Sequence, residues 1–114
     1  MSSEQSAANF DPDRILKAAR ALGPEIQAAR DQIELERRLP MHLVEAMKRA
    51  GIFAMPMPKA WGGPELDPLT QLRILEQLAI ADGSVGWCAM IGCDSGYFTA
   101  FLDQDVARAM YPDI

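Results

Sequence analysis

Apolar residues recur every three or four positions along the first third of the chain, which is the spacing of one face of an α-helix. Asp11-Pro12 marks the start, because an aspartate at the N-cap accepts from free amides and a proline at the first helical position loses no hydrogen bond. Pro24 lacks an amide hydrogen and crowds the carbonyl of Arg20, so we expect a kink or brief break at Gly23-Pro24. The buried face is expected to comprise Ile15, Ala19, Leu22, Ile26, Ala29 and Ile33.

A second helix is predicted to open at Pro40 and to end at Gly51, the residue type that best tolerates a left-handed C-terminal position. Its apolar patch consists of Leu43, Val44, Met47 and Ala50. Residues 52–58 are apolar but include two prolines, which excludes a central strand or a helix interior. We therefore expect an extended, packed segment there, followed by a loop at 59–64 in which Gly62-Gly63 permits positive φ.

Asp67-Pro68 repeats the start signal, and the pattern predicts a third helix that ends at Asp82-Gly83. Its apolar positions are Leu69, Leu72, Ile74, Leu75, Leu78 and Ala79. Ser84 is the expected N-cap of a fourth helix, which runs to about residue 102. That helix is apolar on almost every side and must therefore be surrounded. Asp103 is expected to cap a short last helix over 104–110, which Pro112 closes.

These elements predict an all-α fold, a helical bundle of four or five helices, because the sequence has no internal repeat and no segment of period-two alternation. With 114 residues, 49% of them hydrophobic, the chain has enough apolar material for one core. We expect a single helical domain over residues 11–114. Residues 1–10 are small and polar, and we expect a disordered lead-in there.

The charge distribution argues against several classes of partner. The net charge of -5 comes from scattered acids, and no basic cluster interleaves with the few aromatic residues, so we expect no nucleic-acid or membrane-surface binding. The apolar run at 85–102 is broken by Asp94 and three glycines, which argues against a membrane span. The first ten residues lack the basic and apolar regions of a secretory signal. We therefore expect a cytoplasmic location.

The residues that most often bind metals or react as nucleophiles are sparse. Cys88 and Cys93 are five positions apart with no second pair, and His42 is the sole histidine, so no metal site is expected. We expect both cysteines to be small buried hydrophobes and His42 to be exposed near a helix start. No phosphate-binding loop, nucleophile elbow or zinc-binding helix motif is present, so no catalytic residue is assigned.

Asp94 is the one carboxylate that stands in an apolar helix. An isolated buried carboxylate costs several kcal/mol, so it must be paired, hydrogen-bonded or in contact with water. It either braces a neighbouring helix, faces solvent where the helix emerges, or faces a pocket. The candidate pocket residues share a helical face with it, and three glycines nearby (Gly86, Gly92 and Gly96) leave room for close approach. The face comprises Trp87, Met90, Ile91, Asp94, Ser95 and Phe98.

This face has two interpretations. It packs against another helix, as apolar faces commonly do. Alternatively, it forms the wall of a ligand site, since a flat aromatic and a flexible methionine beside small residues suit an apolar substrate or a flavin ring.

The order of three segments resembles the opening domain of acyl-CoA dehydrogenase-like flavoproteins. The segments are ERRLP at 36–40, LVEAMKRAGIF at 43–53 and PKAWGGPELDP at 58–68. The glycine pair is the most specific piece. LEQLAIADGSVGW at 75–87 is similar to the helix pair of the same domain, so that the resemblance covers about residues 14–112.

The resemblance implies more than the residues themselves do. In that family a β domain and a second helical bundle follow, flavin lies between them, and the catalytic base comes from the last bundle. The chain ends about where the β domain should begin, so we expect a fragment, a truncated gene product or one part of a split arrangement. The implied cofactor is FAD or, alternatively, reduced FMN, bound mainly by regions outside this chain. The implied partners are a small-molecule substrate and, in the full-length protein, further copies of itself.

Two branches of the family give different activities. The first expectation is α,β-dehydrogenation of an acyl-CoA thioester. The alternative is a monooxygenase acting on an aromatic or polycyclic substrate, because Ser84-Val85-Gly86-Trp87 is more similar to the two-component flavin-dependent monooxygenases of this fold. In several of those a histidine about two turns after the tryptophan helps in hydroxylation, whereas here Asp94 and Ser95 occupy that place. A further alternative is a non-catalytic helical interaction module.

Overall fold

The computed structural model describes residues 10–114, and within them it contains helices and no strand, which confirms the all-α prediction. The lead-in expected at 1–10 lies outside the described residues except for Phe10. The α-helices are α2 (Pro12–Ala21), α3 (Gly23–Ala28), α4 (Arg30–Glu36), α5 (Met41–Arg49), α6 (Pro68–Ala81), α7 (Gly83–Asp94) and α8 (Gln104–Met110). The 3₁₀ segments are η1 (Ile52–Ala54), η2 (Lys59–Trp61) and η3 (Ser95–Phe101).

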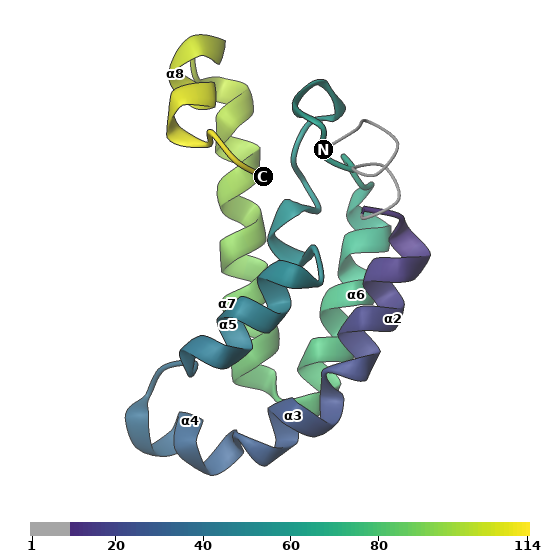
Figure 1. Cartoon of the computed structure of the whole chain (residues 1–114), viewed down its shortest axis with the longest axis vertical. Coiled ribbons are helices and arrows are strands. Elements are labelled where there is room, and N and C mark those ends of the chain that lie inside the picture. The colour runs from purple at the N-terminus through teal and green to yellow at the C-terminus, as the bar shows by residue number, and fades with distance from the viewer. Residues whose placement is uncertain (1–9) are drawn as a thin grey trace.

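An antiparallel pair, α6 and α7, forms the centre of the molecule (Figure 1). Helices α2 and α3 pack on α6, while the η1 segment after α5 packs on α7. At one end α3 and α4 bend away from α2, and at the other end α8 stands beyond α7 (Figure 1). None of the helices over residues 10–114 is long and apolar enough to cross a membrane.

The predicted long first helix is divided at two places. The expected break at Gly23-Pro24 is confirmed, because α2 ends at Ala21 and α3 begins at Gly23. A second break, at Ala29, was not predicted. The apolar face continues across both breaks. Each residue predicted to belong to it is buried, except Leu22, which is half-buried. Asp11 occupies the N-cap, but the prediction of side-chain capping was wrong: its carboxylate and that of Asp13 both stay exposed to water.

The segment after α5 is buried as predicted but not extended. Gly51 adopts the expected left-handed conformation with φ 88°. The chain then turns in 3₁₀ fashion: the amide of Met55 donates to the carbonyl of Ile52 at 3.4 Å, and that of Met57 donates to Ala54 at 2.9 Å. This geometry tolerates Pro56, because the donors are the amides on either side of it and not its own nitrogen.

The two glycines of the following loop serve different purposes. Gly62 has φ 86°, as the sequence predicted. Gly63 has no positive φ but is required for close packing, since a Cβ there would overlap the backbone carbonyl of Met57. That carbonyl also accepts from the amide of Glu65 at 2.9 Å, which holds the loop on the buried segment.

Three aspartates cap helices. Asp67 accepts from the amide of Thr70 at 3.0 Å, and Asp103 accepts from the amide of Asp105 at 3.0 Å, as expected for α6 and α8. The prediction that Ser84 caps α7 was wrong. Asp82 does so, accepting from the amide of Ser84 at 2.8 Å, because Asp82 has extended backbone angles while Gly83 is already helical.

Helix α7 ends at Asp94, earlier than the predicted limit near residue 102, and continues as the 3₁₀ segment η3. Around this transition two side-chain hydroxyls donate hydrogen bonds to backbone carbonyls. Ser95 Oγ donates to the carbonyl of Ile91 at 3.2 Å, and Thr99 Oγ1 donates to that of Gly96 at 2.7 Å. Such bonds draw carbonyls away from regular helix geometry.

Candidate functional site

Helix α7 presents two chemically different faces. Its inner face is made of small residues that are buried against the core: Val85, Gly86, Ala89 and Cys93. Its outer face carries large side chains that stay accessible, with 64% of Trp87, 50% of Ile91 and, on η3, 68% of Phe98 exposed. The helix predicted to be surrounded is therefore covered on one side only by the residues that the structure describes.

The three glycines are used for packing within the chain. A Cβ at Gly86 would lie 2.6 Å from the Cβ of Ala79 on α6. A Cβ at Gly92 would lie 2.7 Å from the ring of Phe53, and one at Gly96 would lie 2.7 Å from Pro56. The room that these glycines leave is taken by α6 and by the segment after α5, and the outer face of α7 points elsewhere.

The candidate pocket residues lie together on that outer face. Trp87, Ile91, Asp94 and Ser95 are exposed, and Met90 is half-buried against the core. Their common face follows from helical register, as predicted. We refer to Trp87, Met90, Ile91, Asp94, Ser95 and Phe98 as the outer α7 face.

Among the alternatives for Asp94, the structure favours exposure to solvent. Its side chain is exposed, and it makes no hydrogen bond or ion pair with a described residue. It therefore braces no neighbouring helix within residues 10–114. Asp94 stands one turn after Ile91 and one turn before Phe98, so a charged acceptor lies in the middle of an apolar surface.

A buried amide, which the sequence did not single out, fixes the position of η3. Gln71 on α6 is 4% exposed, and its Nε2 donates to the carbonyl of Leu66 at 2.7 Å and to the hydroxyl of Tyr97 at 2.8 Å. Both amide hydrogens are thereby satisfied, as burial demands. Gln71 lies three and four positions before the buried Ile74 and Leu75, on the core-facing side of α6, and this register is the signal that could have identified it.

The two cysteines lie in different environments. Cys93 is buried, as expected, and burial raises the pKa of its thiol to about 12. The expectation for Cys88 was wrong: it is exposed, because the helical spacing of five positions places it away from the core-facing side of α7. His42 is exposed as predicted, with its Nε2 3.8 Å from a carboxylate oxygen of Glu25. No three metal-binding side chains gather anywhere in residues 10–114.

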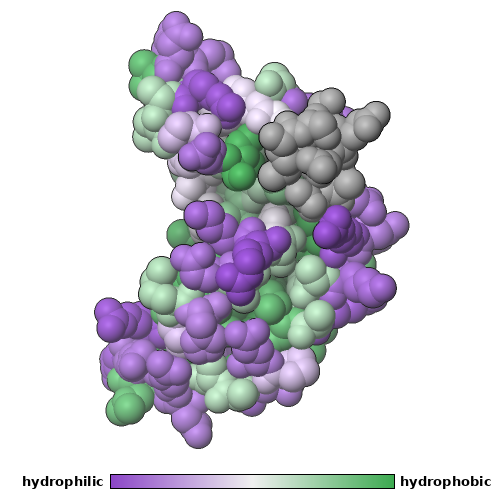
Figure 2. All heavy atoms as spheres, in the orientation of Figure 1, coloured by the Kyte–Doolittle hydropathy of each residue, from purple (hydrophilic) through white to green (hydrophobic). Residues whose placement is uncertain are grey.

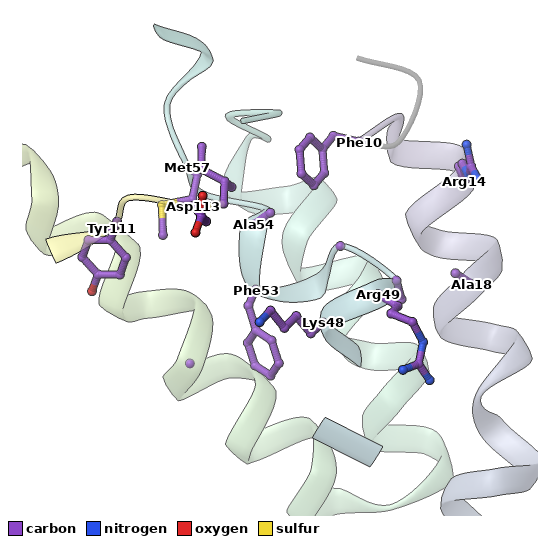
Figure 3. Close-up of a pocket in the computed structure, with 14 residues that line it drawn as sticks. Phe10, Arg14, Ala18, Lys48, Arg49, Phe53, Ala54, Met57, Tyr111 and Asp113 are labelled. Carbon is purple, nitrogen blue, oxygen red and sulfur yellow. The ribbon is translucent and has the colours of Figure 1, made fainter. Parts of the chain in front are cut away.

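An open hollow of about 650 Å³ lies on the other side of α7, between α2, the end of α5 and the segment 111–114. Figure 2 shows hydrophobic residues within the recess between the α8 end and the body of the molecule. The close-up in Figure 3 shows aromatic and basic side chains around this hollow. Its lining was not predicted, since it combines residues from four separate parts of the chain.

Residues 12–106 match the family model described as acyl-CoA dehydrogenase, N-terminal domain. The chain is 34% identical over 94 residues to the flavin-dependent monooxygenase oxygenase subunit HsaA of Mycobacterium tuberculosis (strain CDC 1551 / Oshkosh), covering 82% of this chain and 24% of that protein. It is 33% identical over 75 residues to indole-3-acetate monooxygenase of Acinetobacter baumannii, covering 63% of this chain and 19% of that protein. The enzyme of the same name from Pseudomonas putida is 28% identical over 100 residues, with 80% and 26% covered. The chain thus spans between about a fifth and a quarter of the length of these relatives.

Proposed function

Since the chain belongs to the acyl-CoA dehydrogenase family, as its amino-terminal helical domain, we propose that it forms one wall of the flavin and substrate cavity of a flavin-dependent monooxygenase. The substrate class is an aromatic or polycyclic compound. Of the two activities expected from the sequence, the monooxygenase is favoured by the names of the relatives, among them two indole-3-acetate monooxygenases.

The observation that carries this proposal is the outer α7 face. Its large apolar side chains are exposed together, whereas single exposed apolar residues are the norm on a protein surface. The indole of Trp87 offers a flat surface for stacking of an aromatic ring. The carboxylate of Asp94 would accept a hydrogen bond from a hydroxyl or ring N–H of such a substrate.

The outer α7 face fits a flavin ring but not its phosphate. Trp87, Met90 and Ile91 supply apolar contact area, and no basic residue belongs to the outer α7 face. When bound, the flavin supplies the electrons that activate oxygen. The role proposed for these side chains is to orient the substrate ring beside the flavin and to exclude water.

The test uses a protein that contains this chain together with its flavin-binding regions. With reduced flavin, dioxygen and an indole or phenol substrate we expect a hydroxylated product, one oxygen atom entering the substrate and the other leaving as water. Trp87→Ala is expected to raise the KM for that substrate without unfolding the protein. Asp94→Ala, which removes the acceptor, is expected to raise the KM for substrates that bear a hydrogen-bond donor more than the KM for substrates that lack one. The 114-residue chain alone, supplied with flavin, is expected to show no turnover.

Two results would redirect the proposal. Dehydrogenation of an acyl-CoA thioester without oxygenation of aromatic compounds would place the protein in the dehydrogenase branch. Failure of the larger protein to bind either FAD or reduced FMN would favour the non-catalytic interaction module.

A further inference from the structure

We infer that the hollow between α2, α5 and α7 binds a small amphipathic anion, with an apolar body and a carboxylate or phosphate head. Its volume of about 650 Å³ lies within the range typical of small-molecule sites. The site is distinct from the outer α7 face, because Gly92 lines the hollow and lies on the side of α7 that meets Phe53.

The floor of the hollow suits an apolar body. Phe53 and the buried Ala54 and Met57 come from the packed segment after α5, and Ala18 comes from α2. The aromatic rings of Phe10 and Tyr111 stand on opposite sides of the opening (Figure 3). Aromatic and methionine side chains offer large contact areas, and methionine adapts to ligands of different shape.

The rim carries an excess of positive charge. Lys48 and Arg49 belong to the last turn of α5 and Arg14 to the first turn of α2. The negative groups that line the hollow are the side chain of Asp113 and, in the 114-residue chain, the terminal carboxylate of Ile114. Figure 3 shows Lys48 extending along the hollow on the side of Phe53. Neither Lys48 nor Arg49 takes part in an ion pair among residues 10–114.

This charge excess determines the class of ligand. The protein as a whole has a net charge of -5. A local cluster of cations beside an apolar floor is therefore opposite in sign to the net charge of the protein. Lysine and arginine at the carboxyl end of α5 also interact favourably with the helix dipole. That interaction does not explain why an apolar hollow lies beside them. A carboxylate or phosphate would pair with Lys48, which extends toward Phe53 in Figure 3, while its apolar body covers Phe53 and Met57.

The test measures binding of 2-naphthoate, 2-naphthyl phosphate and the neutral 2-naphthamide to the 114-residue chain, by calorimetry and by shifts of assigned amide resonances. We expect saturable binding of at least one of the two anions, with shifts at Gly51, Phe53 and Gly92. The substitution Lys48→Gln is expected to weaken that binding about tenfold, as loss of about one charge-assisted contact does.

A matched control removes the same charge elsewhere. Lys17 is exposed and does not line the hollow, so Lys17→Gln should leave binding unchanged. Ala18→Trp fills the hollow without altering charge and is expected to abolish binding. The inference is overturned if the amide binds as tightly as the anions, if both charge variants weaken binding equally, if the shifts centre on Trp87 and Ile91, or if neither anion binds at millimolar concentration.

Discussion

The thiol of Cys93 donates a hydrogen bond to the backbone carbonyl of Ile52 across 3.0 Å, between residues that are 41 positions apart. This contact joins α7 to the turn that follows α5, beside the place where Gly92 meets Phe53. The thiol therefore serves packing, and its environment differs from that of the exposed Cys88 only five positions earlier.

The two thiols should react at very different rates. A thiolate is the reactive species, and burial raises the pKa of Cys93 to about 12, so Cys93 stays protonated and shielded in the folded protein. We expect iodoacetamide at pH 8 to label Cys88 rapidly and Cys93 only after unfolding. Peptide mapping by mass spectrometry checks this, and labelling of Cys93 as fast as Cys88 in the native protein would contradict the packing described.

The raised pKa of the Cys93 thiol predicts a loss of stability in alkaline solution. The Cys93 thiol has a pKa of about 12 when folded against an ordinary value of 9.0, so above pH 9 the unfolded chain releases a proton that the folded chain retains. The stability contributed by the protonated thiol is present below pH 9 and declines between pH 9 and 12, by at most about 1.4 kcal/mol per pH unit.

Comparison with a variant isolates this contribution from the other groups that titrate in the same range. In denaturant unfolding between pH 7 and pH 10.5, Cys93→Ala should lose less stability than the wild type as the pH rises. Parallel pH dependences for the two proteins would show that the thiol has no raised pKa.

Close contact between α6 and α7 predicts opposite outcomes for two glycine substitutions. A methyl group at Gly86 meets both the Cβ and the Cα of Ala79, and the backbone there cannot move without separating the helices. We expect Gly86→Ala to cost about 1 to 3 kcal/mol. Gly83 is also helical, but no atom from another part of the chain lies within 4 Å of the position that a methyl group would take there, so Gly83→Ala should be neutral or stabilising by up to about 1 kcal/mol. Chemical denaturation of both variants measures the contrast.

Much of the fold was predictable from local signals. The face from Ile15 to Ile33, the cap at Asp67 and the left-handed Gly51 depend on residues near in sequence, where spacing and backbone preference determine the outcome. The composition of the outer α7 face was equally predictable from helical register.

The remaining features depend on distant contacts. The 3₁₀ turn at Ile52–Ala54 is held where Cys93 and Gly92 meet it, and the two hydrogen bonds of Gln71 reach Leu66 and Tyr97. The hollow near Lys48 combines separate elements, so no single stretch of sequence encodes it. Such contacts override local propensity, and the pattern of residues along the chain does not predict them.

Exposed aromatic residues along α7 and η3 predict association of the isolated chain. Trp87, Phe98 and Phe101 are 64%, 68% and 85% exposed, and exposed apolar patches of this kind mark interaction surfaces. We expect sedimentation velocity to show a species that grows with concentration, and Phe98→Ser with Phe101→Ser to reduce it. Leu35 is also 85% exposed but lies on α4, so Leu35→Ser serves as the control. A single monomeric species in the wild type at high protein concentration would contradict this expectation.

Truncation of Trp87 separates a surface role from a core role. Because 64% of Trp87 is exposed, Trp87→Ala leaves no closed cavity, and we expect it to cost less than about 1 kcal/mol of unfolding free energy in the isolated chain. Leu78 is fully buried in the core, so Leu78→Ala should cost about 2 to 5 kcal/mol in the same experiment. In a protein that also contains the flavin-binding regions, Trp87→Ala should then change the KM or kcat for an aromatic substrate while the melting temperature stays close to that of the wild type. A loss of stability in that larger protein as large as that for Leu78→Ala, with unchanged kinetics in the folded enzyme, would show that the outer α7 face packs against another helix and forms no substrate wall.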